Sequence, residues 1–382
     1  ELYLTKVQLG KLLSGFLIGY TAFQIPWGIL GDRFGARYVL AAAALVWGVT
    51  SFFTGLVPGL LLKAGTASFV ALYLLRLLLG MAEAAGFPVA ARAVASHMPV
   101  SRHGFGYAAV VAGTAAGSSI TPPLIAFLMT TRGWRASFYV TSVFAFALAA
   151  VWLVVTRPSI KALGAAGPSS ATAADRASWK RLLREPMIWL LSASYFFESY
   201  VLYVFVFWSY LYLVEQRHFT LLRGGFYTGL PFLAAFIAVP LVGYASDVMT
   251  VRRGYRVGRR NAAICLMVLS AVFLLFSVRV GNSQVAVGAL SVSVASLLSV
   301  ESIFWSSSIE LGGRYAGTAG AIMNTAGNLG GIISTIAVPL LIQRLGWTIA
   351  FGSTGLLAAI SAALWFKIGS RRLENGSGQE AV

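Results

Sequence analysis

The chain has 382 residues, of which 58% are hydrophobic and 11% are charged, whereas charged residues make up about a quarter of an ordinary soluble domain. This composition excludes a soluble globular protein and indicates an integral membrane protein. The formal net charge of +17 could suggest nucleic-acid binding, but the basic residues gather on alternate loops between apolar stretches, which is typical of membrane insertion.

Apolar stretches long enough to cross a hydrocarbon core of roughly 30 Å recur along almost the whole chain. They predict an all-α polytopic membrane protein with about eleven visible spans. We place the spans near residues 10–30, 38–57, 68–91, 105–130, 136–156, 186–213, 223–246, 260–278, 283–308, 315–342 and 347–367.

Positive charge sets the expected orientation. Lysines and arginines gather at 31–37, 102, 157–184, 252–260 and 367–372, and the intervening loops hold fewer. Because cytoplasmic loops attract positive charge during insertion, we expect the loop at 31–37 to face the cytoplasm. Residues 1–6 would then lie outside, and one further span is expected before them. Compact loops and the single cysteine favour the inner membrane of a bacterium.

The longest polar segment, residues 157–185, predicts a cytoplasmic linker. It separates an N-terminal half at 1–156 from a C-terminal half at 186–370, and a cytoplasmic tail at 371–382 follows. A similar feature returns in each half, because the stretch from Pro26 to Asp32 and the stretch from Pro240 to Asp247 both end a span and precede arginines. With the expected leading helix, the chain becomes two six-helix halves, a common plan for transporters with a central site.

Arg76 and Glu83 lie seven residues apart in an apolar run. On one helix they would share a face, about 10 Å apart along the axis. A charge buried in hydrocarbon costs at least roughly 2.5 kcal/mol, so such a pair is a candidate functional site. Burial favours the neutral form of Glu83 and the nearby cation favours its charged form, which makes it a candidate proton carrier. A permanent structural salt bridge is the alternative.

Other polar side chains also fall within the predicted spans. Glu198 and Glu301 are further intramembrane carboxylates, expected either to face the cavity and carry protons or to join helices. Tyr20, Tyr203 and Trp305 could stack on a substrate or pack in the core. Asn324 and Asn328 lie four residues apart, where amides bind ligand or join helices.

The sequence offers no support for an enzyme. It contains no phosphate-binding glycine pattern and no nucleophile motif with a plausible partner. Its three histidines, His97, His103 and His218, fall in or beside loops without the spacing of metal ligands. We therefore expect no catalytic residue, no cofactor and no metal.

The segment Gly28-Ile-Leu-Gly-Asp-Arg-Phe-Gly-Ala-Arg37 resembles the loop signature of the major facilitator superfamily. The resemblance implies a major facilitator fold. It also implies a gating role for Asp32, Arg33, Arg37 and, in the second copy, Asp247, through ion pairs that hold one gate closed. A plain insertion signal is the alternative.

A closer resemblance is carried by the segments Arg76 to Pro88, Gln24 to Pro26, Pro231 to Phe236 and Asn324 to Gly331. They are similar to the anion:cation symporter family, which includes proton-coupled transporters of galactonate and hexuronates. The resemblance implies that Glu83 takes part in proton coupling and that Arg76 belongs to the same charged network. It further implies that Tyr20, Ser302, Trp305 and Asn324 line the substrate cavity, to which we add Gln24, Tyr203 and Asn328 as candidates.

The chain also departs from the family pattern. Gly113 stands where galactonate-type members have a glutamine, so one substrate hydrogen bond would be lost. Glu198 and Glu301 are additional carboxylates, which puts galactonate itself in doubt and could mean a cationic group on the substrate.

These patterns predict a monomeric, proton-coupled symporter of an organic anion, such as a sugar acid or related carboxylate, that works by alternating access. Its partners would be the small anion, protons and the lipid bilayer. An anion antiporter or a facilitative carrier is the first alternative. A non-transporting receptor that senses a ligand with the same fold is a weaker one, because only a short segment follows the last predicted span.

Overall fold

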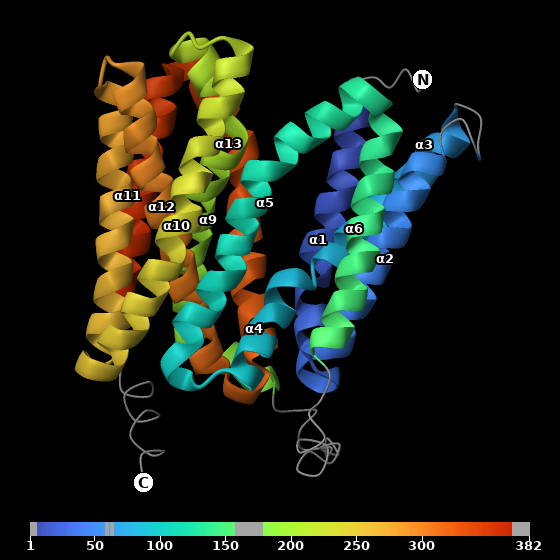
Figure 1. The fold of residues 1–382 in the computed structure, drawn as a ribbon. Coiled ribbons are helices and arrows are strands. Elements are labelled where there is room, and N and C mark those ends of the chain that lie inside the picture. The colour runs from blue at the N-terminus through green and yellow to red at the C-terminus, as the bar shows by residue number, and fades with distance from the viewer. Residues whose placement is uncertain (1–5, 58–60, 62–64, 157–178, 369–382) are drawn as a thin grey trace. The chain divides into compact units, whose positions relative to one another are not determined.

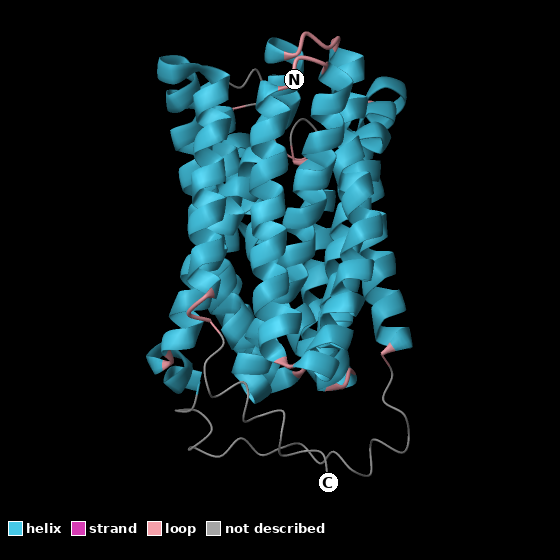
Figure 2. Ribbon diagram, turned by 90° about the vertical axis from the view of Figure 1, so that its left-hand side faces the viewer, coloured by secondary structure: helices cyan, strands magenta, loops and turns pink. Residues whose placement is uncertain are grey.

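The computed structural model describes residues 6–57, 61, 65–156 and 179–368. Helices make up nearly all of this part, and no strand occurs within it (Figure 2). The predicted all-α class is therefore confirmed. The tail at 371–382 and most of the predicted linker lie outside the described residues.

The chain forms two compact units. The first unit comprises Glu1–Ala93, Pro122–Arg184 and Arg314–Ala321, and the second comprises Val94–Thr121, Glu185–Gly313 and Ile322–Val382. The helices that lie within the first unit are α1 (Lys6–Phe34), α2 (Ala36–Leu56), α3 (Thr66–Glu83) and α6 (Trp134–Val155). Three helices contribute to both units, namely α4 (Gly86–His97), α5 (His103–Arg132) and α13 (Ala316–Trp365). The predicted division into two halves of six helices stays a prediction.

In the first unit, glycines allow α1 and α3 to pack closely. A Cβ at Gly80 would collide with the carbonyl oxygen of Phe16, and a Cβ at Gly19 would collide with that of Leu77. Small residues permit this backbone approach where two helices cross. The indole N–H of Trp27 on α1 also donates to the carbonyl of Met81 on α3. These contacts hold α1 against α3, the helix that carries the predicted charged pair.

The predicted span at 68–91 consists of two helices rather than one. Helix α3 ends at Glu83, a turn follows at Ala84, and α4 begins at Gly86. Pro88 has no N–H to donate to the carbonyl of Ala84, so one hydrogen bond of a continuous helix cannot form there. Glu83 consequently sits at a helix end, beside a break in the backbone.

The second unit is built around α12 (Ser283–Gly312), which is buried along most of its length. It packs against α9 (Pro186–Leu211), α10 (Leu221–Arg253) and α11 (Ala262–Arg279), and Figure 1 shows α11 and α12 side by side. Short π-helical turns follow α9 at Tyr212–Gln216 and precede α11 at Arg256–Asn261. Elsewhere in the described residues of both units, short 3-10 turns occur at Val100–Arg102, Trp179–Arg184 and Gly313–Tyr315.

The predicted spans fall on helical segments, but their number and their boundaries differ from those predicted. Within the described residues, seven helical stretches are long and apolar enough to cross a membrane. The last of them, Ser283–Trp365, runs through three predicted spans, and its helix α13 is kinked at Gly346, where φ is 78°. The count of about eleven spans and the expected leading helix stay predictions.

Candidate functional site

Helix α3 places Arg76 and Glu83 seven residues apart in the interior of the first unit. The guanidinium of Arg76 lies over the ring of Phe138 on α6, 5.3 Å from its centroid. Arg76 and Glu83 are both half-buried and interact electrostatically, yet no ion pair or hydrogen bond joins them among the described contacts. The arrangement leaves the guanidinium donors able to bind an anion, since an arginine stays charged in any protein environment.

Two predicted substrate residues lie on α1, the helix that packs against α3. Gln24 is fully buried, and the half-buried Tyr20 stacks on Phe16 with ring centroids 5.8 Å apart. The first unit thus brings the helix of Tyr20 and Gln24 against the helix of Arg76.

The second unit holds the two other predicted proton carriers in its core. Glu198 on α9 is 0% exposed and Glu301 on α12 is 6% exposed. The hydroxyl of Ser199 donates to Glu198 Oε2 at 3.1 Å, and the hydroxyl of Tyr195 donates to Glu301 Oε1 at 3.0 Å. Glu198 Oε1 has no hydrogen-bond partner within the described part of the chain.

Trp305 and Ser302 lie on α12 beside these carboxyls, and both are fully buried. The indole N–H of Trp305 donates to the hydroxyl of Tyr195 at 3.3 Å. Its ring stacks on Tyr107 of α5, with centroids 4.6 Å apart and planes 12° from parallel. Sequence reasoning missed both Tyr107 and Tyr195, because no local pattern separates them from the many aromatic residues in these helices.

The remaining predicted substrate residues join α9 to α13. The hydroxyl of Tyr203 donates to Asn328 Oδ1 at 2.9 Å, and Asn324 lies buried one turn earlier on α13. Glycines at 327 and 331 let α13 approach α9, since a Cβ there would collide with the rings of Tyr195 and Tyr203. Asn328 therefore joins helices here, and a role in substrate binding stays a prediction.

Asp32, predicted as a gating residue, binds the start of α13 within the first unit. Its carboxylate accepts the backbone N–H groups of Gly317 at 2.9 Å and Thr318 at 2.8 Å, and the Thr318 hydroxyl at 2.7 Å. Arg92 of α4 lies 3.9 Å from the same carboxylate. An anion at a helix N-terminus is stabilised by free N–H donors and by the helix dipole.

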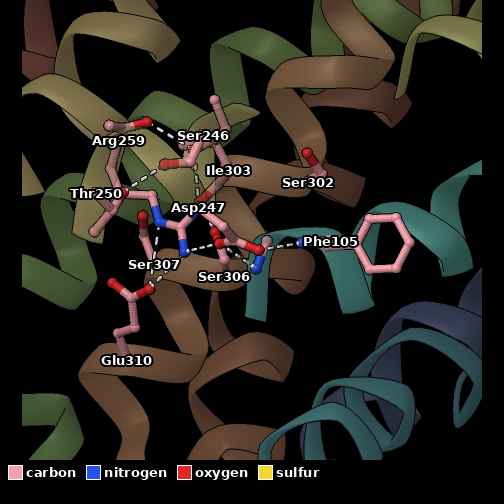
Figure 3. A network of polar contacts seen from close by, with 12 residues as sticks. Phe105, Ser246, Asp247, Thr250, Arg259, Ser302, Ile303, Ser306, Ser307 and Glu310 are labelled. Atoms are coloured by element: carbon pink, nitrogen blue, oxygen red, sulfur yellow. Dashed lines mark hydrogen bonds and ion pairs between the residues drawn. The ribbon is translucent and has the colours of Figure 1, made fainter. Parts of the chain in front are cut away.

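Asp247 makes the same contact in the second unit, where it binds the start of α5 (Figure 3). It accepts the backbone N–H groups of Gly104 at 2.9 Å and Phe105 at 2.7 Å. The two copies of the repeated feature therefore each place an aspartate on two successive N–H groups of a helix start. This supports the internal repeat expected from the sequence.

A buried arginine completes the network around Asp247. Arg259 is 0% exposed and forms ion pairs with Asp247 at 2.7 Å and with Glu310 of α12 at 2.9 Å. It also donates to the hydroxyl of Ser246 at 2.8 Å. Sequence reasoning missed Arg259 and Glu310, although an arginine twelve residues after an acidic helix end was a visible signal.

The two arginines predicted to act with Asp32 have other contacts. Arg37 donates to the carbonyls of Leu153 and Thr156 at the end of α6, at 3.0 and 3.1 Å. Arg33 is exposed and lies over the ring of Phe34. A gating role for these arginines stays a prediction. Among the described residues, no group of three His, Cys, Asp or Glu side chains could hold a metal ion.

Comparison with known proteins gives consistent matches along the chain. A family model described as the Major Facilitator Superfamily matches residues 1–335. A probable sulfoacetate transporter of Cupriavidus necator is 31% identical over 95% of this chain and 85% of that protein. A D-galactonate transporter of Escherichia coli is 28% identical over 95% of this chain and 86% of that protein.

A solved structure has a similar fold. The fucose:proton symporter of Escherichia coli superposes with a TM-score of 0.71 at 14% identity, covering 96% of this chain and 92% of that one. At this identity the likeness shows the fold alone.

Proposed function

Because this chain belongs to the major facilitator superfamily, and within it to the anion:cation symporter family, we propose that it carries a small organic anion across the membrane together with protons. Its relatives are transporters, so the protein is a multi-pass membrane transporter and not an enzyme. The substrate class is an acid related to sugar acids or to small sulfonated carboxylates, in line with the names of those relatives. A bacterial inner membrane and a monomeric carrier are part of the proposal.

The observation that carries the proposal is that Arg76 is half-buried and forms no described ion pair. This half-buried guanidinium lies over the Phe138 ring, and no described carboxylate forms an ion pair with it. A permanent salt bridge, the structural alternative, would occupy its donors. A carboxylate or sulfonate substrate can instead bind the guanidinium fork through two parallel hydrogen bonds.

Proton coupling at Glu83 follows from its electrostatic contact with Arg76. When an anion binds Arg76, the positive charge is shared and Glu83 loses part of its stabilisation as a carboxylate. A proton then binds Glu83 more readily, so that anion and proton are loaded together. Tyr20 and Gln24, on the helix packed against α3, are proposed to line the substrate position in the first unit. For the second unit, substrate roles are proposed for Tyr203, Ser302, Trp305, Asn324 and Asn328.

Asp32 and Asp247 supply the gate in this mechanism. Each holds the N-terminus of one helix by two backbone N–H groups. These contacts can break and reform during alternating access, because each is a local set of hydrogen bonds at a helix end.

The test uses purified protein in proteoliposomes, with sulfoacetate and D-galactonate as probes. We expect uptake of at least one probe to rise when the lumen is made alkaline. Glu83→Gln should keep exchange of labelled for unlabelled probe but lose the response to the gradient, and Arg76→Gln should lose both. Glu215→Gln, at an exposed carboxyl in the turn after α9, serves as the matched control.

The outcomes separate the alternatives. If the pH gradient does not change the uptake rate of the parent protein, symport is excluded, and antiport or facilitated diffusion remains as the transport mode. Wild-type uptake by Arg76→Gln would refute the anion site. Absence of exchange with every organic acid in a broad panel would favour a receptor.

A further inference from the structure

Two kinds of buried carboxyl pair occur in the second unit. Asp247 and Glu310 flank Arg259, so their negative charges are compensated by a cation at 2.7 and 2.9 Å. Glu198 and Glu301 are as deeply buried but have no such cation. The difference points to different protonation states for the two pairs.

The hydrogen-bond donors that reach Glu198 and Glu301 are all neutral. Among the described contacts they are the hydroxyls of Ser199 and Tyr195, and the indole N–H of Trp305 donates in turn to Tyr195. No arginine, lysine or histidine of the described chain forms an ion pair with either carboxyl. Among the described titratable groups, the phenols of Tyr195 and Tyr203 interact with the pair, and Tyr107 stacks on the neighbouring Trp305; none of the three carries a positive charge.

The two carboxyls also act on each other electrostatically. Two ionised carboxylates in one buried site repel each other and both lose their hydration, so such pairs hold a proton between them. Glu198 Oε1 is the atom that fits this proton, because it is buried and has no donor from the described residues. An acid hydrogen there removes one negative charge without requiring extra volume.

We propose that Glu198 and Glu301 form a second proton-binding site of the transport cycle, in which the two carboxyls hold one proton between them. The proposal rests on the proposed proton-coupled transport and adds to it one proton beyond that of Glu83. The proton comes from water and returns to water, and only an O–H bond forms and breaks. A sodium ion or a substrate ammonium group is disfavoured, because both carboxyls are almost wholly buried.

The hydrogen bonds of the pair link the proton to the predicted substrate residues. Tyr195 donates to Glu301 and accepts from Trp305, and Trp305 stacks on Tyr107 of α5. Loss of the shared proton leaves two like charges that must separate or become hydrated, which would shift Tyr195 and Trp305. The site can therefore couple proton release to a rearrangement of α9 against α12, the two helices that carry it.

The first test does not depend on transport. Infrared spectra of the purified full chain at pH 7 report protonated carboxyls by their C=O stretch. We expect Glu198→Gln/Glu301→Gln to lose intensity in this band relative to the parent, and Glu215→Gln, at an exposed carboxyl, to keep it. A band unchanged in the double variant would overturn the proposal whatever the transport data show.

The second test measures protons moved per molecule of probe, from the pH gradient that halts net flux of whichever probe the parent takes up. We expect the ratio to fall by one in the double glutamine variant, with Glu83 intact. An unchanged ratio would overturn the role of the pair in the cycle. If uptake by the parent ignores the gradient, the proposed function fails, and the infrared test still decides whether the pair holds a proton.

A second double variant serves as a control in case the glutamine variant does not fold. Glu198→Met/Glu301→Met replaces both carboxyls by apolar side chains of similar volume, a change that is often neutral or stabilising for buried charged groups. It is expected to behave as the glutamine pair does in both tests, and a band or a ratio equal to that of the parent would overturn the proposal in the same way.

Discussion

Substitution of Arg259 by methionine tests the network that holds the second gating aspartate. Methionine keeps the length of the side chain and removes the charge and the donors. Arg259 compensates two carboxylates, and the exposed side-chain fractions are 1% for Arg259, 4% for Asp247 and 10% for Glu310. Removing one partner of such a buried set leaves uncompensated charge and costs about 3–5 kcal/mol. Asp247 keeps the N–H groups of Gly104 and Phe105, which places the effect at the lower end of that range.

The assay is thermal unfolding of the purified protein in detergent, followed by intrinsic fluorescence. We expect a clearly lowered midpoint for Arg259→Met. The variant that also carries Asp247→Asn and Glu310→Gln should recover most of the loss, because no buried charge then lacks a partner. Arg260→Met is the matched control, since the neighbouring arginine contacts only the exposed Asn261 side chain among the contacts described, and pairs of this kind contribute about 1 kcal/mol or less. A midpoint for Arg259→Met equal to that of the parent would refute the reasoning.

Two further substitutions test the packing and the gate of the first unit. Gly80→Ala adds a methyl group against backbone and should cost about 1–3 kcal/mol in the same unfolding assay, whereas the exposed Gly86, with open space around it, should tolerate alanine without loss. Equal stability of the two variants would contradict the close crossing of α1 and α3. Asp32→Asn weakens a charge-assisted helix cap by about 1–2 kcal/mol, a factor of roughly 5–30 in an equilibrium. It should raise the alkylation rate of a cysteine placed at the buried Ala316, in a Cys265→Ser background, and an unchanged rate would argue against a gate there.

Features that depend on a single helix were predicted well from the sequence. The all-α class and the family are confirmed, and the predicted apolar stretches lie on helical segments. Arg76 and Glu83 lie on α3, since their spacing needed only helical periodicity. The break after Glu83 was missed, although Gly86 and Pro88 were visible signals, because the apolar run continues unbroken across it.

Contact partners that come from distant segments of the chain could not be predicted from residue spacing in the sequence. Asp247 and Arg259 meet because α10 ends just before Gly254, where φ is 81°, and a π-helical turn then leads into α11, while Glu310 joins them from α12. Arg37 looked equivalent to Arg33 beside Asp32, but it donates to the end of α6, more than a hundred residues away in sequence. A run of charges near a helix end thus indicates a candidate gate, while the tertiary packing decides which partner each charge has.

The same reasoning applies to the intramembrane carboxyls, whose chemistry depends on what faces them. Glu310 and Glu301 lie on the same helix, nine residues apart, and serines occur within two residues of each in the sequence. Arg259 reaches one of them, which stabilises a carboxylate, and Tyr195 reaches the other, which can donate to a carboxylate or a neutral acid alike. Arg259 forms its ion pairs with Asp247 and Glu310, so no described cation compensates Glu198 and Glu301, and the proposed proton would do so. One helix can in this way carry a fixed ion pair for the gate and a titratable site for coupling, and each can be altered without removing the other.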